Sequence, residues 1–265
     1  MYFPGPSFER SETPSIIAAA MWTFFHKLGS PPWLYTISGQ ILRWLLPAAL
    51  LALIVGMCWG LLFTAPDFRQ GNSYRIIYIH VPAAVVALGG YYIMAIAGAI
   101  SLIWKMKMAD IAMLAAAPVG AALTFIALVT GSIWGKPTWG TWWVWDARIT
   151  SMLILLFLYL GVMALYEAYD NKVAASRACA VLALVGTVNI PIIYKSVDWW
   201  YSLHQPASIK FTGGSTIDPS MLYPLLLCIV AFYALFACAL MANMRVTILD
   251  RERRTGWVRR LVEES

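Results

Sequence analysis

The chain has 265 residues, of which 61% are hydrophobic and only 12% are charged. Soluble domains carry roughly 25% charged residues, so this composition excludes a water-soluble globule and indicates a membrane protein. The formal net charge is +6, and six arginines lie within residues 245–265. Such a cluster is typical of a cytoplasmic tail near anionic lipid, and it does not imply nucleic-acid binding.

Six apolar segments are long enough to span a bilayer, and none contains Asp, Glu, Lys, Arg or His. They cover residues 44–63, 83–104, 112–134, 149–166, 178–194 and 221–243. The predicted fold is an all-α membrane protein, a six-transmembrane-helix bundle with a Trp-rich outward loop between the third and fourth spans. We divide the chain into an N-terminal tail with an interfacial segment (1–40), a membrane domain (41–244) and a basic cytoplasmic tail (245–265).

Small residues and prolines predict how the spans pack. The pairs Gly56xxxGly60 and Gly131xxxGly135 predict close helix contacts, and the prolines predict kinks. The prolines for which we predict kinks are Pro47, Pro118 and Pro191. The four cysteines form no CxxC or CxxCH spacing, so the sequence encodes neither a zinc site nor covalent haem attachment. We therefore interpret all of these residues as architecture.

Basic residues predict the orientation in the membrane. Of the 19 Lys and Arg, 13 fall in the termini and in the loops after spans two and four. The remaining six fall in loops 64–82, 135–148 and 195–220. Because basic residues accumulate on the cytoplasmic side, we expect cytoplasmic termini and three outward loops.

Residues 134–148 read WGKPTWGTWWVWDAR and carry the strongest local signal. Five tryptophans occur there: Trp134, Trp139, Trp142, Trp143 and Trp145. One Trp near the end of a span is typical of an interfacial aromatic belt. Five in one loop favour a platform for a planar apolar ligand, with mobility from Gly135 and Gly140. Asp146 is expected to cap the fourth span, to orient an indole N–H or to pair with Arg148.

Two of the three histidines lie at matching places in the first and third outward loops. Each is followed by x-Pro, in His80-Val81-Pro82 and in His204-Gln205-Pro206. Pro82 suits the first turn of a helix, which would keep His80 just outside the second span. A single loop histidine is usually solvated, but two neutral imidazoles from opposite loops can occupy both axial positions of a flat macrocycle resting on indoles. Haem is the planar ligand that would bind both to two imidazoles and to an indole surface.

The two propionates of haem require cations. Six basic residues lie on the outward side: Arg69, Arg75, Lys136, Arg148, Lys195 and Lys210. We select Arg75, Lys136 and Arg148 as candidates, although ordinary solvation of a loop explains each one separately. Trp199 and Trp200 form either a second aromatic wall or part of the belt.

The residues 134–148 resemble the tryptophan-rich WWD signature of membrane haem-handling proteins of bacterial cytochrome c maturation. Within that group the chain resembles the heme exporter protein C family in its length, its six spans and its two flanking histidines. The segments NSYRIIYIHVPAA (72–84) and SLHQ (202–205) extend the resemblance. It runs from about Trp22 through the sixth span, and the first 20 residues and the tail look unshared.

The resemblance implies a b-type haem, bound transiently between His80 and His204 over the Trp platform at the periplasmic face of the bacterial inner membrane. It implies delivery of this haem to a periplasmic haem chaperone. It also implies three protein partners, which are a small single-span protein D and the subunits A and B of an ABC-transporter complex.

Three other functions are alternatives to haem delivery. No Ser-His-Asp or Cys-His arrangement is recognisable, so we expect no enzyme. A b-type cytochrome subunit for electron transfer also uses two histidines, but it predicts them inside helices, where the six apolar segments have none. A permease or structural subunit without haem would use the Trp loop only to dock a partner.

Overall fold

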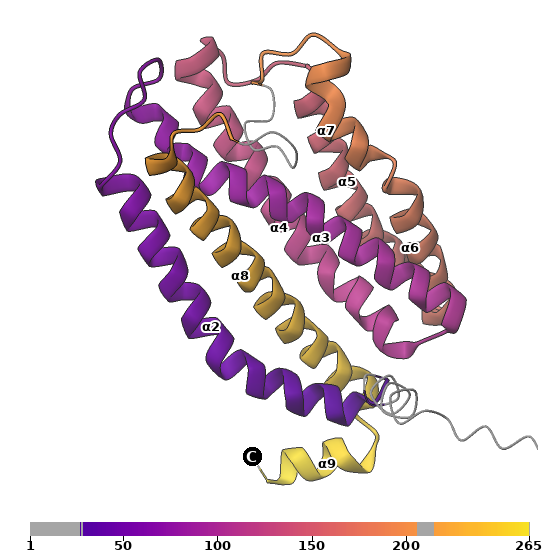
Figure 1. Ribbon diagram of the computed structural model, residues 1–265. Coiled ribbons are helices and arrows are strands. Elements are labelled where there is room, and N and C mark those ends of the chain that lie inside the picture. The colour runs from indigo at the N-terminus through magenta and orange to yellow at the C-terminus, as the bar shows by residue number, and fades with distance from the viewer. Residues whose placement is uncertain (1–26, 28, 206–214, 265) are drawn as a thin grey trace, which may run out of the picture.

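The computed structural model describes residues 27, 29–205 and 215–264. Within these residues six helical segments are long and apolar enough to cross a membrane, and no extended strand occurs. The predicted all-α six-span bundle is therefore confirmed (Figure 1). The helices are α2 (Pro31–Leu62), α3 (Ile77–Trp104), α4 (Lys107–Trp139), α5 (Ala147–Ala168), α6 (Lys172–Gly186), α7 (Asn189–Trp199), α8 (Pro219–Glu252) and α9 (Gly256–Glu263), and the short 3-10 helix η1 covers Asn72–Ile76.

The helices extend beyond the apolar segments that predict them. Helix α2 begins with proline at its first turn, where a missing N–H costs no hydrogen bond, so residues 31–40 are helical. Helix α8 continues to Glu252, and α9 follows within the basic tail. Hydropathy detects only the part of a helix that lies in the hydrocarbon, which explains the difference. Residues 1–26 of the predicted tail and interfacial segment lie outside the described residues.

The fifth span, predicted as one helix over 178–194, consists of two helices. Helix α6 ends at Gly186, and α7 begins at Asn189. Pro191 is the third residue of α7, and a proline lacks an N–H and clashes with the carbonyl four residues earlier, here that of Thr187. Pro191 therefore interrupts the α-helical hydrogen bonding at Thr187 and Val188, although both residues keep right-handed helical dihedral angles.

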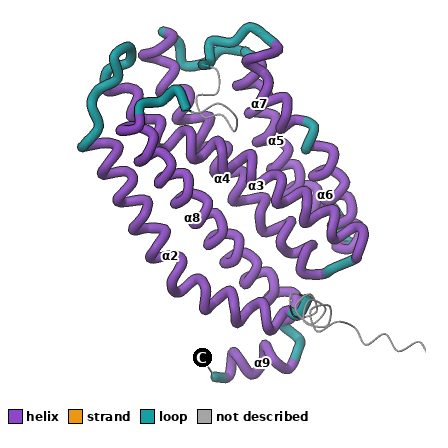
Figure 2. The backbone as a smooth tube through the Cα atoms, viewed as in Figure 1, coloured by secondary structure: helices purple, strands orange, loops and turns teal. Residues whose placement is uncertain are grey.

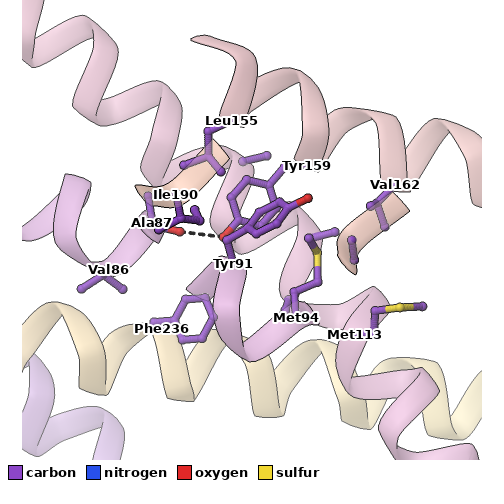
Figure 3. Close-up of a cluster of buried hydrophobic side chains, with 14 of the residues drawn as sticks. Val86, Ala87, Tyr91, Met94, Met113, Leu155, Tyr159, Val162, Ile190 and Phe236 are labelled. Atoms are coloured by element: carbon purple, nitrogen blue, oxygen red, sulfur yellow. Dashed lines mark hydrogen bonds between the residues drawn. The ribbon is translucent and has the colours of Figure 1, made fainter. Parts of the chain in front are cut away.

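The bundle has three parts that lie side by side. Helices α2 and α8 pack against each other, α3 and α4 form the centre, and α5, α6 and α7 cover the far side (Figure 1). The main core joins the centre to the far side (Figure 3). There the rings of Tyr91 and Tyr159 lie 5.0 Å apart, and the Tyr159 hydroxyl donates to the Ala87 carbonyl over 2.8 Å.

The two ends of the bundle differ in chemistry. Loops 63–71, 140–146 and 200–205 gather at one end, and α9 lies at the other (Figure 2). The arginines that follow α8 belong to the α9 end, and those at 253, 254, 259 and 260 are exposed. The candidate residues His80, Trp134, Trp139 and His204 lie at the loop end.

Candidate functional site

A pocket of about 350 Å³ lies at the loop end, between α3, α4, α5 and α7. Its walls are mostly apolar, and Ile217 and Leu225 close one side. Five residues predicted from the sequence line it: His80, His204, Trp134, Trp139 and Arg148. The volume falls within the range of about 300–1,000 Å³ that is usual for small-molecule sites. The structure thus brings both histidines to one cavity.

His80 lies inside a helix, and the prediction that it precedes the second span is wrong. It is the fourth residue of α3. Because η1 already forms a helical turn before Ile77, the chain is helical when it reaches His80, and Pro82 lies inside α3. The argument that placed both histidines outside helices, and so disfavoured a b-type cytochrome, therefore holds for His204 only.

The His80 imidazole is held by α4. Its Nδ1 lies 3.0 Å from the Ala127 carbonyl oxygen and 3.1 Å from Thr130 Oγ1. A carbonyl oxygen only accepts hydrogen bonds, so Nδ1 carries the proton and Nε2 keeps its lone pair. The ring meets Trp134 edge-on at 5.7 Å, and the Trp134 indole N–H donates to Gln70 Oε1 over 2.7 Å.

The His204 imidazole is held in the same way by a carboxylate. Its Nδ1 lies 2.9 Å from Asp146 Oδ2, and its ring lies 4.6 Å from that of Trp139. Asp146 Oδ1 accepts from the Ile149 amide over 2.8 Å, which confirms the expected cap of α5. Asp146 therefore orients a histidine rather than an indole.

Burial keeps the His204 imidazole neutral. Burial lowers the pKa of the His204 imidazole below its usual value, although the nearby Asp146 carboxylate acts in the opposite direction. Burial would raise the pKa of Asp146, but hydrogen bonds from the Ile149 amide, Ser202 and His204 outweigh it and lower that pKa. At pH 7 the imidazole is thus neutral and the carboxylate ionised, with Nε2 of His204 unprotonated.

The sequence predicted that the Trp-rich segment 134–148 is a loop. Its first part is helical instead, because α4 continues to Trp139. Pro137 lies near the end of α4, and Gly140 ends the helix at φ +80°, a left-handed conformation that favours glycine. Only residues 140–146 are irregular. The other three tryptophans, Trp142, Trp143 and Trp145, do not line the pocket. The rings of Trp143 and Trp145 lie 5.4 Å apart, and Trp145 is 76% exposed.

The three candidate cations have different surroundings. Arg148 lines the pocket and donates to Ser196 Oγ over 3.3 Å and to the Tyr194 and Gln205 carbonyls over 3.3 and 3.4 Å. Arg75 and Lys136 instead donate to backbone carbonyls, of Thr64 over 2.7 Å and of Gly140 over 3.1 Å. Neither lines the pocket, and Lys210 lies outside the described residues.

Sequence reasoning missed the role of four residues that contact His80, His204 or Trp134. These are Gln70, Thr130, Gly131 and Ser202. A Cβ at Gly131 would lie 3.0 Å from His80 Cε1, so this glycine makes room for the imidazole. The prediction of close helix contacts is confirmed at Gly131, which meets His80 of α3, but is wrong at Gly135, which faces the Trp139 ring of its own helix. Gly56xxxGly60 does meet other helices, at Cys228 and Tyr78.

The residues present fit a flat metal macrocycle. Among the described residues, neither His80 Nε2 nor His204 Nε2 has a hydrogen-bond partner, although both Nδ1 atoms are held. Metal-binding histidines typically show this arrangement, in which the second nitrogen fixes the tautomer and the ring orientation. Two indoles, apolar walls and one cation complete a site for an apolar ring with acidic substituents.

Comparison with known proteins agrees with this chemistry. The model of the family described as heme exporter protein C matches residues 24–259. The chain belongs to the heme exporter protein C family. The family member of Escherichia coli (strain K12) is 52% identical over 242 residues, which are 91% of this chain and 98% of the relative. That of Haemophilus influenzae is 44% identical over 243 residues, 92% of this chain and 99% of the relative. The family resemblance stated from the WWD segment is confirmed, but the expectation that the tail is unshared is wrong, because the match extends to residue 259.

Proposed function

We propose that this chain, as part of a haem export complex for cytochrome c maturation, binds haem in the pocket between α3, α4, α5 and α7 and delivers it. His80 and His204 supply the two axial nitrogens, each through Nε2. One observation carries the proposal: both imidazoles line one cavity with Nδ1 held, by Ala127 and Thr130 in one case and by Asp146 in the other. The bound haem is b-type, because the described cysteines show no attachment spacing.

The rest of the pocket recognises the porphyrin. Trp134 and Trp139 contact the two imidazoles and supply aromatic surface beside them. Arg148 is the candidate for a propionate, because its present hydrogen bonds are long and go to uncharged acceptors. A propionate would offer it the shorter, charge-assisted hydrogen bonds that arginine forms with carboxylates.

The site faces the periplasm of a bacterial inner membrane, and both termini are cytoplasmic. The support is the arginine-rich end at α9, because basic residues favour the cytoplasmic side. The chain passes haem to a periplasmic haem chaperone and acts with a small single-span protein D and with the ABC-transporter subunits A and B. The exposed Trp142 and Trp145 flank the site and provide surface for the acceptor.

The visible spectrum of the purified full chain tests this proposal. We expect a low-spin haem spectrum for the wild type, and a changed spectrum with weaker haem retention for His80→Ala and for His204→Ala. Phe68→Ala is the control, since Phe68 is 99% exposed and does not line the pocket. An unchanged Soret band in both histidine variants, with normal loading of the chaperone, would refute the ligand assignment.

A further inference from the structure

The two imidazoles are held by partners of different charge. His204 donates its Nδ1–H to a carboxylate, that of Asp146, over 2.9 Å. His80 donates its Nδ1–H to uncharged oxygens, those of the Ala127 carbonyl and the Thr130 hydroxyl, at 3.0 and 3.1 Å. The Thr130 hydroxyl donates its own proton to the Ile126 carbonyl over 2.6 Å, so it only accepts from His80.

The carboxylate of Asp146 is fixed in place. Its Oδ1 is the cap of α5, and its Oδ2 accepts the Ser202 hydroxyl over 2.5 Å in addition to His204. The Ser202 oxygen in turn accepts the backbone N–H of His204 over 3.1 Å. The side chains of His204 and Asp146 are only 16% and 9% exposed. Asp146 cannot turn away from His204 without losing the cap and the hydrogen bond from Ser202.

These partners make the two nitrogens unequal as metal ligands. An imidazole that donates to a carboxylate gains electron density at Nε2 and binds a metal more strongly than one that donates to a neutral oxygen. The difference is built into the fold, because one partner belongs to the start of α5 and the others to the backbone and hydroxyl groups of α4.

We infer that His204, positioned by Asp146 and Ser202, is the anchoring ligand of the haem, and that His80 is the ligand released first when the haem passes to its acceptor. This inference rests on the function proposed above. In the exchange, the lone pair of His80 Nε2 leaves the iron and a lone pair of the acceptor replaces it, so no electron is transferred. His204 keeps the haem bound until its own bond to the iron is exchanged in turn.

Haem titration of the full chain in micelles, followed at the Soret band and by electron paramagnetic resonance, tests the inequality. We expect His80→Ala to retain haem in a five-coordinate state that added imidazole converts back to a six-coordinate spectrum. His204→Ala should lose far more affinity than His80→Ala. Equal losses in the two variants, with both spectra changed, would overturn the inequality but leave the haem site in place. Unchanged binding in both would overturn the proposed function itself.

Matched variants of the two partners test the positioning role. Asp146→Asn keeps a good helix cap but removes the charge, and we expect a loss of haem affinity of about 10–100-fold. It should also shift the resonance signals, which a purely structural role would not move. Thr130→Val removes one of two neutral partners of His80 and should cost clearly less. Equal effects of Asp146→Asn and Thr130→Val would contradict the inference.

Discussion

At the scale of single residues, the position of the His80 ring depends on the absence of a side chain at Gly131. The ring packs against α4 at this glycine, one turn beyond Ala127, whose carbonyl accepts its Nδ1–H. A Cβ at 3.0 Å from His80 Cε1 is closer than ordinary van der Waals contact, so the ring would have to move. Gly131 therefore sets the direction in which His80 presents its other nitrogen.

We predict that Gly131→Ala weakens haem binding several-fold while leaving the thermal stability unchanged or higher, because alanine favours a helix interior over glycine by about 1 kcal/mol. Haem titration and thermal unfolding measure the two effects. The control is Gly161→Ala in α5, where the added Cβ would lie 3.4 Å from Leu182 and meet ordinary packing. If both variants bind haem as the wild type does, Gly131 does not position His80.

At the scale of elements, the break in the fifth span shapes one wall of the pocket. Asn189, the first residue of α7, is buried, and its side-chain amide donates to the Ser151 carbonyl of α5 over 2.9 Å. This bond ties α7 to α5 just below the pocket, where Ile193 and Tyr194 form the lining. Pro191 causes the break, and Asn189 decides where the second half packs.

We predict that Asn189→Leu, which keeps the branching of the side chain but removes the donor, lowers the free energy of unfolding by about 1 kcal/mol, the usual net contribution of one hydrogen bond. Haem affinity should fall as well, because α7 carries part of the pocket wall. Chemical unfolding in detergent measures the first effect, and Val188→Ala is the control, since Val188 is 64% exposed. Equal stability of the two variants would argue against a role of Asn189 in tying α7 to α5.

At the scale of the whole molecule, the bundle has a pocket end and a basic end. The pocket end carries the exposed aromatic residues Phe68, Trp142 and Trp145. The basic end carries α9, whose Val258 is buried while its arginines are exposed. Because exposed arginine is favoured on the cytoplasmic side, this polarity supports the proposed opening of the pocket toward the periplasm.

We predict that a membrane-impermeant maleimide labels Phe68→Cys in intact cells, and labels Arg254→Cys only after the inner membrane is permeabilised. The background carries Cys58→Ser, because Cys58 is exposed and the other three cysteines are buried. That background alone should remain unlabelled under both conditions. The reverse pattern would place the pocket in the cytoplasm and refute delivery to a periplasmic acceptor.

Short-range sequence patterns were sufficient to predict the fold class and the candidate residues of the site. Apolar length identifies spans because each helix satisfies its own backbone hydrogen bonds inside a bilayer. The Trp cluster, the two histidines and the Asp146 cap are likewise visible in short segments. The bounds of α3, α4 and the fifth span were less accurate, because a helix continues past its apolar part until a cap or a proline ends it.

The sequence by itself therefore determined the membrane class, the number of spans, the family and the two histidines. The tertiary structure decided which two of the five tryptophans meet those histidines, which cation lines the pocket, and how each Nδ1 is held. The partners of His80 on α4 are 47 and 50 positions away, and Asp146 is 58 positions from His204. Contacts over such separations arise from the packing of helices against one another, and no local pattern of residue types encodes them.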